Sequence, residues 1–264
     1  MTAARSSYQS LLSLASAAGC MGIEVRNDLE GELFDGLTPL AAAEFAQAAS
    51  LQILALAEVP AFNDLSERAM TMAAKLAKTA AECGAAGISL IPRNDGLDTA
   101  KKTRVNNLEQ TLIKLASMLE QRKLLGFIEP LGFEQSSLRY KSEVVDVIQR
   151  LGLDARFKLI HDTFHHHLAG EQNYFPAHTG IVHISGVTDK SLSVQQMRDE
   201  HRVLIDQFDR LNNIEQISAL QSGGYAGPVS FEAFSPRVHT LKKPQAALLE
   251  SCDYLASSMT TAVI

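Results

Sequence analysis

KLIHDTFHHHLAGEQNYFPAHTGIVHISG, residues 158–186, is the stretch that decides the fold. It covers most of two short apolar runs, residues 157–160 and 180–182. The first run ends at His161 and Asp162, and the second at His183. Runs this short and this rich in Ile, Leu and Val are typical of buried parallel strands. A polar residue directly after such a strand lies at its carboxyl end, where parallel sheets and barrels place their chemistry.

The same pattern occurs twice more along the chain. Residues 124–128 (LLGFI) run into Glu129, and residues 228–231 (PVSF) run into Glu232. A single acid at a strand end is typical of a helix N-cap or of a solvated loop. Four parallel strands, however, bring their carboxyl ends to one edge. We therefore expect a shared metal site made of Glu129, Asp162, His183 and Glu232.

Strands and helices alternate strictly along the chain, which is the signature of βαβ units. We expect strands at residues 22–26, 51–59, 86–91, 124–128, 157–161, 180–182 and 228–231. We expect helices at residues 6–19, 38–49, 64–83, 97–121, 141–151, 214–221 and 244–256, with a short helical turn after residue 162. A length of 264 residues suits an α/β fold of the TIM (β/α)8 barrel type, which needs about 250 residues. We expect residues 1–264 to form one such domain.

Seven strands are predicted where a complete barrel has eight. The absent strand should precede the first helix, but only residues 1–5 lie there. We therefore expect the first strand to be missing or rudimentary, and a truncated start is the explanation that we favour.

The charge balance excludes several classes of partner. There are 24 Lys and Arg against 30 Asp and Glu, for a net charge of −6, so we expect neither nucleic acid nor an anionic membrane as partner. The apolar stretches are too short to cross a bilayer, and no basic-then-apolar leader opens the chain. Cys20, Cys83 and Cys252 are too scattered for a disulfide framework or a thiolate zinc site, which favours a reducing cytoplasmic setting.

Three carboxylates and one imidazole form an oxygen-rich ligand set. Such a set suits one divalent ion, Mn²⁺, Mg²⁺, Co²⁺ or a catalytic Zn²⁺ with open positions. A metal that holds a carbonyl and a neighbouring hydroxyl acidifies the C–H between them and stabilises an enediolate. Glu129 and Glu232 come from strands that are not neighbours, so they could flank a substrate and move a proton between adjacent carbons.

Several motifs resemble those of a known family. HDTFHHHLAGE, TGIVHISGV, MRDEHRVLID, GYAGPVSFEAF and GIEVRNDL look like segments of the xylose-isomerase-like TIM barrels, and among these most like the 2-keto-myo-inositol (inosose) isomerase group. The resemblance covers most of the chain from Gly22 onward. It implies that the four strand-end residues bind the metal and that the two glutamates transfer the proton. It also implies that His165 and Arg202 contact substrate oxygens.

Other polar side chains have competing interpretations. Glu24 could line the substrate cavity or form a charge pair with Arg26 in the barrel wall. His165, His166 and His167 are consecutive and cannot all face one point, because neighbouring residues on a helix lie about 100° apart. We favour His165 as the one that faces the site. His161, next to Asp162, is expected to point into the barrel wall.

The leading function is that of a metal-dependent isomerase or epimerase of a ketose or keto-cyclitol, acting in carbohydrate metabolism and specifically inositol catabolism. An inosose dehydratase-type lyase would use the same site, and a non-catalytic sugar-binding barrel would use the same fold. A metal-cluster endonuclease is disfavoured, because residues 51–59 and 86–91 end without histidine. The sequence determines neither the metal nor the substrate, and it leaves a homo-oligomer open.

Overall fold

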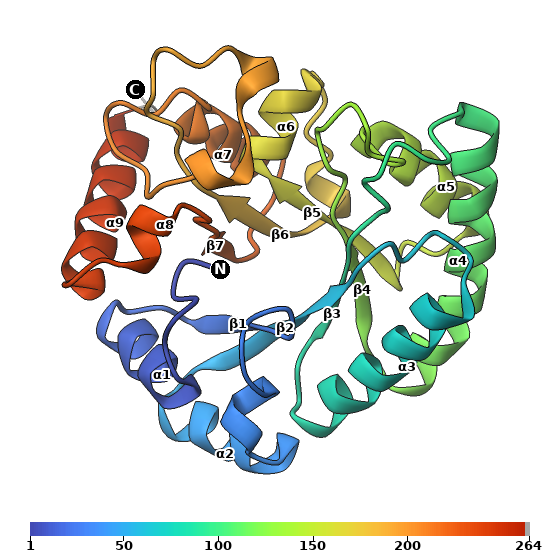
Figure 1. The fold of residues 1–264 in the computed structure, drawn as a ribbon, viewed down its shortest axis with the longest axis horizontal. Coiled ribbons are helices and arrows are strands. Elements are labelled where there is room, and N and C mark those ends of the chain that lie inside the picture. The colour runs from blue at the N-terminus through green and yellow to red at the C-terminus, as the bar shows by residue number, and fades with distance from the viewer. Residues whose placement is uncertain (262–264) are drawn as a thin grey trace.

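Seven strands form the centre of the molecule, and the computed structural model describes them within residues 1–261 (Figure 1). The strands are β1 (Gly22–Arg26), β2 (Gln52–Val59), β3 (Gly87–Leu90), β4 (Leu125–Ile128), β5 (Phe157–Asp162), β6 (Thr179–Ile184) and β7 (Val229–Phe231). Each pairs in parallel with the next, in the order β1 to β7. The result is a nearly closed TIM barrel, as the alternation predicted.

The barrel lacks one strand, and its two edges are β1 and β7. Residues at the start of the chain lie beside β7: the Thr2 hydroxyl donates to the Phe231 carbonyl at 2.9 Å and accepts from the Ala233 N–H at 2.9 Å. Figure 1 shows the N-terminus at this seam. The expectation of a missing first strand is confirmed. A cavity of about 300 Å³ lies at the seam, and its lining includes Met21 and Glu232.

Helices surround the strands (Figure 1). They are α1 (Tyr8–Ala17), α2 (Pro39–Ala48), α3 (Glu67–Glu82), α4 (Lys101–Gln121), α5 (Lys141–Leu151), α6 (Thr163–Ala169), α7 (Asn213–Ser222), α8 (Pro236–His239) and α9 (Pro244–Thr261). Short 3-10 turns are η1 (Leu33–Gly36), η2 (Pro176–His178), η3 (Val194–Gln196) and η4 (Asp199–His201). The last two lie in the long connection between β6 and α7, where no helix or strand was predicted.

Two helices begin three or four residues later than predicted, and each has a local cause. α3 starts at Glu67 rather than near residue 64, because Leu65 has a left-handed φ of 62° and the Ser66 side chain caps the helix by accepting from the Ala69 N–H at 3.1 Å. α4 starts at Lys101 rather than near residue 97, because Asp98 has a φ of 55°. The predicted N-cap of α2 is correct, since the Thr38 hydroxyl accepts from the Ala41 N–H.

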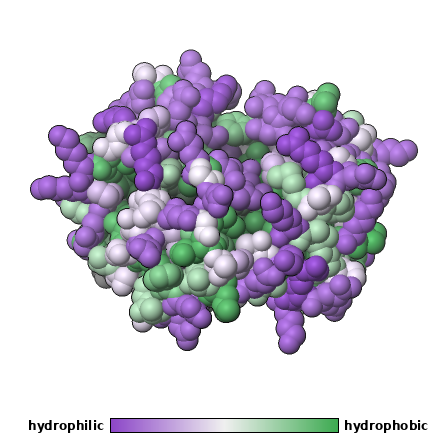
Figure 2. Space-filling view, turned by 60° about the horizontal axis from the view of Figure 1, so that its bottom comes forward, coloured by the Kyte–Doolittle hydropathy of each residue, from purple (hydrophilic) through white to green (hydrophobic). Residues whose placement is uncertain are grey.

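Apolar side chains of the strands and of the inner helix faces form the main core, which runs from Tyr8 to Leu159. Hydrophilic side chains dominate the face in Figure 2, with smaller hydrophobic patches between them. None of the helices within residues 1–261 combines the length and apolar character that a membrane crossing requires. Buried charged side chains are therefore concentrated at the carboxyl ends of the strands.

Candidate metal centre

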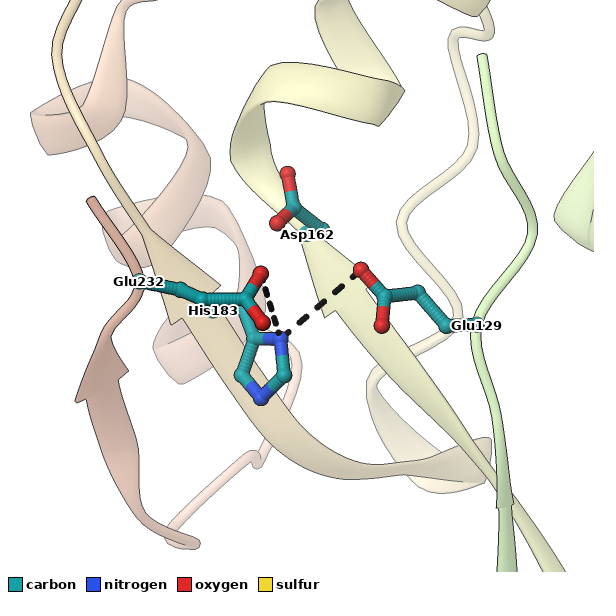
Figure 3. A group of neighbouring side chains, drawn as sticks. All are labelled: Glu129, Asp162, His183 and Glu232. Atoms are coloured by element: carbon teal, nitrogen blue, oxygen red, sulfur yellow. Dashed lines mark ion pairs between the residues drawn. The ribbon is translucent and has the colours of Figure 1, made fainter. Parts of the chain in front are cut away.

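The four predicted strand-end residues meet at one point. Glu129 follows β4, Asp162 ends β5, His183 lies in β6 and Glu232 follows β7. All four side chains are buried, and one potential ligand atom from each lies within 4.8 Å of the others. Figure 3 shows the carboxylates of Glu129 and Glu232 turned toward the imidazole, with Asp162 beside them. Parallel pairing explains the convergence, since Asp162 and His183 are register partners across β5 and β6.

His183 faces the other acids with Nδ1. This atom lies 3.3 Å from Glu232 Oε2 and 3.8 Å from Glu129 Oε1. It is buried and, among the described residues, has no partner with hydrogen-bond geometry. On the opposite side of the ring, Nε2 lies 3.1 Å from both oxygens of Glu24. Burial alone would lower the pKa of His183, but Glu24 and Glu232 outweigh it and hold that pKa well above its usual value.

This arrangement fits a divalent ion. Three carboxylates and one imidazole are a mixed oxygen and nitrogen set that suits Mn²⁺, Mg²⁺, Co²⁺ or Zn²⁺. The unpartnered Nδ1 of His183 points among the acids, where a ligand atom is needed. Metal-binding histidines commonly give their other ring nitrogen to a carboxylate, which fixes the tautomer, and Glu24 lies where such a carboxylate belongs.

Two arginines hold Glu232. Arg26 Nη1 donates to Oε1 at 2.7 Å, and Arg202 Nη2 donates to Oε2 at 3.0 Å. Burial favours the neutral acid, but His183, Arg202 and Arg26 hold the pKa of Glu232 well below its usual range. Arg202 Nη2 also donates to Asp162 Oδ2 at 2.5 Å, so one guanidinium bridges two candidate ligands.

Glu129 has the opposite environment. Its carboxylate lies near the imidazoles of His183 and His165, and the structure shows no arginine ion pair to it among residues 1–261. Burial, with the Glu232 charge adding to it, raises the pKa of Glu129 to about 7. The two glutamates therefore differ: one is held ionised and the other can carry a proton near neutrality.

His165 lies at the site, as predicted. Its backbone N–H donates to Asp162 Oδ1 at 3.0 Å, which caps α6, and its Nε2 lies 3.9 Å from Glu129 Oε1. The rings of Phe133 and Phe164 contact it edge-on, each with centroids 5.2 Å away. Burial lowers the pKa of His165 to about 3, helped by the Arg202 charge, so its imidazole is neutral.

Arg202 is fully buried in the site rather than solvated in its loop. Its guanidinium lies between the rings of Phe234 and Phe164, at 4.6 and 5.0 Å from their centroids. Sequence reasoning did not find Phe234, nor the ion pair of Arg26 with Glu232. The sequence did contain a signal for Arg26. Residues two apart on a strand share a face, and Glu24 was already a candidate for the lining of the substrate cavity.

The remaining histidines of the central stretch lie elsewhere. His161 is buried in the wall, as expected, and its Nε2 donates to Gln216 Oε1 at 2.9 Å. His166 faces away from the four acids and contacts Lys141 at 2.5 Å. His167 is only half-buried. The structure thus brings one histidine of the triplet to the site.

Comparisons with known proteins agree with this fold. A family model described as "Xylose isomerase-like TIM barrel" matches residues 12–258. A xylose isomerase domain containing protein from Salmonella typhimurium LT2 is 28% identical, with a TM-score of 0.88 over 98% of this chain and 94% of that one. No curated protein matches the chain.

Two further solved structures share the fold at lower identity. The IOLI protein, solved with a bound zinc atom, is 21% identical with a TM-score of 0.84, over 95% of this chain and 92% of that one. D-psicose 3-epimerase from Clostridium cellulolyticum H10, solved with D-tagatose, is 12% identical with a TM-score of 0.74, over 97% of this chain and 94% of that one.

Proposed function

The chain belongs to the xylose isomerase-like TIM barrel family, and from this premise we propose that it is a divalent-metal-dependent isomerase or epimerase of a ketose or an inosose-type keto-cyclitol. The observation that carries the proposal is the convergence of Glu129, Asp162, His183 and Glu232 at the barrel mouth. These four residues would hold one divalent ion. When bound, the ion would polarise a carbonyl and an adjacent hydroxyl and so acidify the C–H between them.

The chain's own acids would then move the proton. Glu232, held ionised by Arg26 and Arg202, can accept a proton from one substrate carbon. Glu129, which lies across the site beside the imidazoles of His183 and His165, can deliver one to the neighbouring carbon. The result is a 1,2-proton transfer through an enediolate between the two glutamates.

The substrate oxygens would be held by His165 and Arg202. His165 offers one N–H donor from a neutral ring, and Arg202 offers a positive charge beside Asp162 and Glu232. Glu24 was predicted to contact substrate. Because both its oxygens lie 3.1 Å from His183 Nε2, we propose that it acts on the substrate through His183.

The comparisons support a small-sugar substrate. One structural neighbour was solved as an epimerase with a ketose, and another was solved with zinc. We extend this to the finer proposal of inositol catabolism, because the motifs of the central stretch resemble the inosose isomerase group. The three cysteines are free, which supports our proposal of a cytoplasmic enzyme.

Deuterium incorporation tests the proposal. The protein would be loaded with Mn²⁺ or Zn²⁺, its metal content measured, and inosose and ketohexoses incubated with it in D₂O. We expect deuterium at the carbon next to the carbonyl, together with an isomer or epimer. Glu129→Gln and Glu232→Gln should each lower the rate by about 10²- to 10⁴-fold at equal metal occupancy. The control is Glu143→Gln, a carboxylate that pairs with Arg104 away from the site.

The same experiment distinguishes the proposed function from the two alternative functions. An enone that absorbs in the ultraviolet, instead of an isomer, would assign a lyase. Ligand binding without any exchange, unchanged in both glutamine variants, would assign a sugar-binding barrel. No exchange with any of these substrates at proven metal occupancy would contradict the proposed function.

A further inference from the structure

Glu232 differs from the other three candidate ligands in the support that its strand provides. β4, β5 and β6, which lead to Glu129 or carry Asp162 and His183, each pair with a strand on both sides. β7 is an edge strand that pairs with β6 alone, and none of its three residues is fully buried. Backbone pairing therefore fixes Glu232 less firmly than it fixes the other three residues.

The seam also leaves room for the Glu232 side chain to move. The cavity of about 300 Å³ beside β7 is lined by Glu232 and Arg26 among others. Within the described part of the chain, the hydrogen bonds to the Glu232 carboxylate come from Arg26 and Arg202. The position of this carboxylate thus depends on the two arginines.

Arg26 reaches Glu232 from the opposite side of the seam. It is the last residue of β1, the other edge strand, and its Nη1 donates to Glu232 Oε1 at 2.7 Å. The Arg26 side chain is 8% exposed and that of Glu232 is 5% exposed, so the pair is shielded from solvent. Because β1 and β7 share no backbone pairing, this ion pair joins the two edges of the sheet beside the metal centre.

Two further carboxylates anchor Arg26. Asp28 accepts from Nε and Nη2 at 2.9 and 2.8 Å, and Glu58 of β2 accepts from Nη2 at 2.9 Å. The Asn27 side chain in turn fixes the Glu58 backbone, by accepting from its N–H at 2.8 Å and donating to its carbonyl at 3.2 Å. A guanidinium holds its donors in a rigid planar fork, so the anchored Nε and Nη2 set the direction of Nη1.

The two arginines hold different oxygens of Glu232. Arg202 contacts Oε2, which is also the oxygen that lies 3.3 Å from His183 Nδ1. Arg26 contacts Oε1 instead. Oε2 is therefore the oxygen on the side of the metal centre, and Arg26 can hold Glu232 by Oε1 without occupying it.

We propose that Arg26 is a positioning residue: anchored on Asp28 and Glu58, it bridges the open seam and keeps Glu232 oriented with Oε2 toward His183. The role of Glu232 as ligand and base rests on the proposed function. The orientation of its carboxylate can be tested without any substrate.

Orientation can be separated from charge at Arg26. Its guanidinium contacts the carboxylates of Asp28, Glu58 and Glu232, each within 2.9 Å. A lysine would supply the same positive charge, but its ammonium is compact and lacks the fork, so it cannot hold all three in fixed directions. Arg26→Lys therefore keeps the charge and removes the bridge.

The test compares Arg26→Lys and Glu58→Met with the wild type. Glu58→Met removes one anchor and leaves the guanidinium in place. Glu143→Met is the matched control, because Glu143 forms a comparable partly buried pair with Arg104 away from the site. Each protein is loaded with Co²⁺, whose visible absorption spectrum reports the coordination geometry. Co²⁺ affinity, kcat and KM are measured in parallel.

We expect Arg26→Lys to alter the Co²⁺ spectrum, to weaken Co²⁺ binding by about 10- to 100-fold, and to lower kcat more than it raises KM. Glu58→Met should change these quantities in the same direction. The double variant should be no worse than Arg26→Lys, because the two residues act as one unit. Glu143→Met should match the wild type.

A wild-type spectrum and affinity in Arg26→Lys would overturn the proposal, since charge without the fork would then suffice. Unaltered values in Glu58→Met would overturn the anchoring by Glu58, whatever the activity. A wild type that binds Co²⁺ but exchanges deuterium into no substrate would overturn the proposed function instead, and the spectra would still decide the role of Arg26.

Discussion

Glu24 lies behind His183: both its carboxylate oxygens are 3.1 Å from Nε2, on the side of the ring opposite the nitrogen that faces Glu129 and Glu232. The imidazole is therefore oriented by the first strand of this barrel, although it is carried by the sixth. A residue of β1 thus belongs to the candidate metal centre without offering a ligand atom of its own.

Glu24→Gln should weaken metal binding by about 10- to 100-fold, because an amide can donate to Nε2 and so permit the wrong tautomer of His183. Isothermal titration with Mn²⁺ or Zn²⁺ measures the change. Glu143→Gln should leave the affinity at its wild-type value. Equal affinity in wild type and Glu24→Gln would show that Glu24 does not position His183.

Arg202→Met should destabilise the metal-free protein by about 3–5 kcal/mol, because it leaves Asp162 and Glu232 without the guanidinium that bridges them. A divalent ion neutralises the same carboxylates, so added metal should raise the melting temperature of the variant more than that of the wild type. Thermal unfolding with and without metal checks this. A loss that metal does not reduce would mean that the arginine stabilises the fold independently of the site.

Lys141 should make stability depend on pH in a defined direction. Its pKa falls from an ordinary 10.5 to about 8 in the folded protein, so between these values the unfolded chain binds a proton that the folded chain does not. The free energy of unfolding should therefore rise with pH across this window, by on the order of 3 kcal/mol. Urea unfolding of wild type and Lys141→Met at pH 7.5 and 10 measures it. An identical pH dependence in both proteins would contradict the assignment.

Gly132→Ala should disturb α6. A Cβ at Gly132 would lie 2.2 Å from the His165 carbonyl oxygen, so either α6 or the loop that carries Glu129 must move. We expect a stability loss of about 1–3 kcal/mol and a lower kcat. Gly227→Ala crowds only the Tyr225 side chain, away from the acids, and should cost stability without a change in kcat. Full activity in Gly132→Ala would show that this contact does not position His165.

Local sequence signals were sufficient to predict a strand and its carboxyl end where the whole strand spans only a few residues. The runs before Glu129 and Asp162 are apolar, and the polar residue comes at once, so the strand end and its ligand could be predicted together. Parallel pairing then made convergence at one edge a necessary consequence. The N-cap Thr38, followed by Pro39, was equally local.

Contacts between distant segments could not be predicted in this way. Lys141 precedes His166 by 25 residues, and nothing in the sequence around either residue indicates that the two side chains are in contact. The bridging of Asp162 and Glu232 by Arg202 depends on how the long connection after β6 folds, through η3 and η4. The left-handed Leu65, which delays α3, has no signature either, since leucine rarely adopts a positive φ.

Anomalous diffraction from a crystal loaded with Mn²⁺ or Zn²⁺ tests the central claim most directly. The account predicts one peak within about 2.0–2.3 Å of ligand atoms from all four residues, with His183 bound through Nδ1. A peak elsewhere in the molecule, or no peak at a metal concentration that supports turnover, would contradict it.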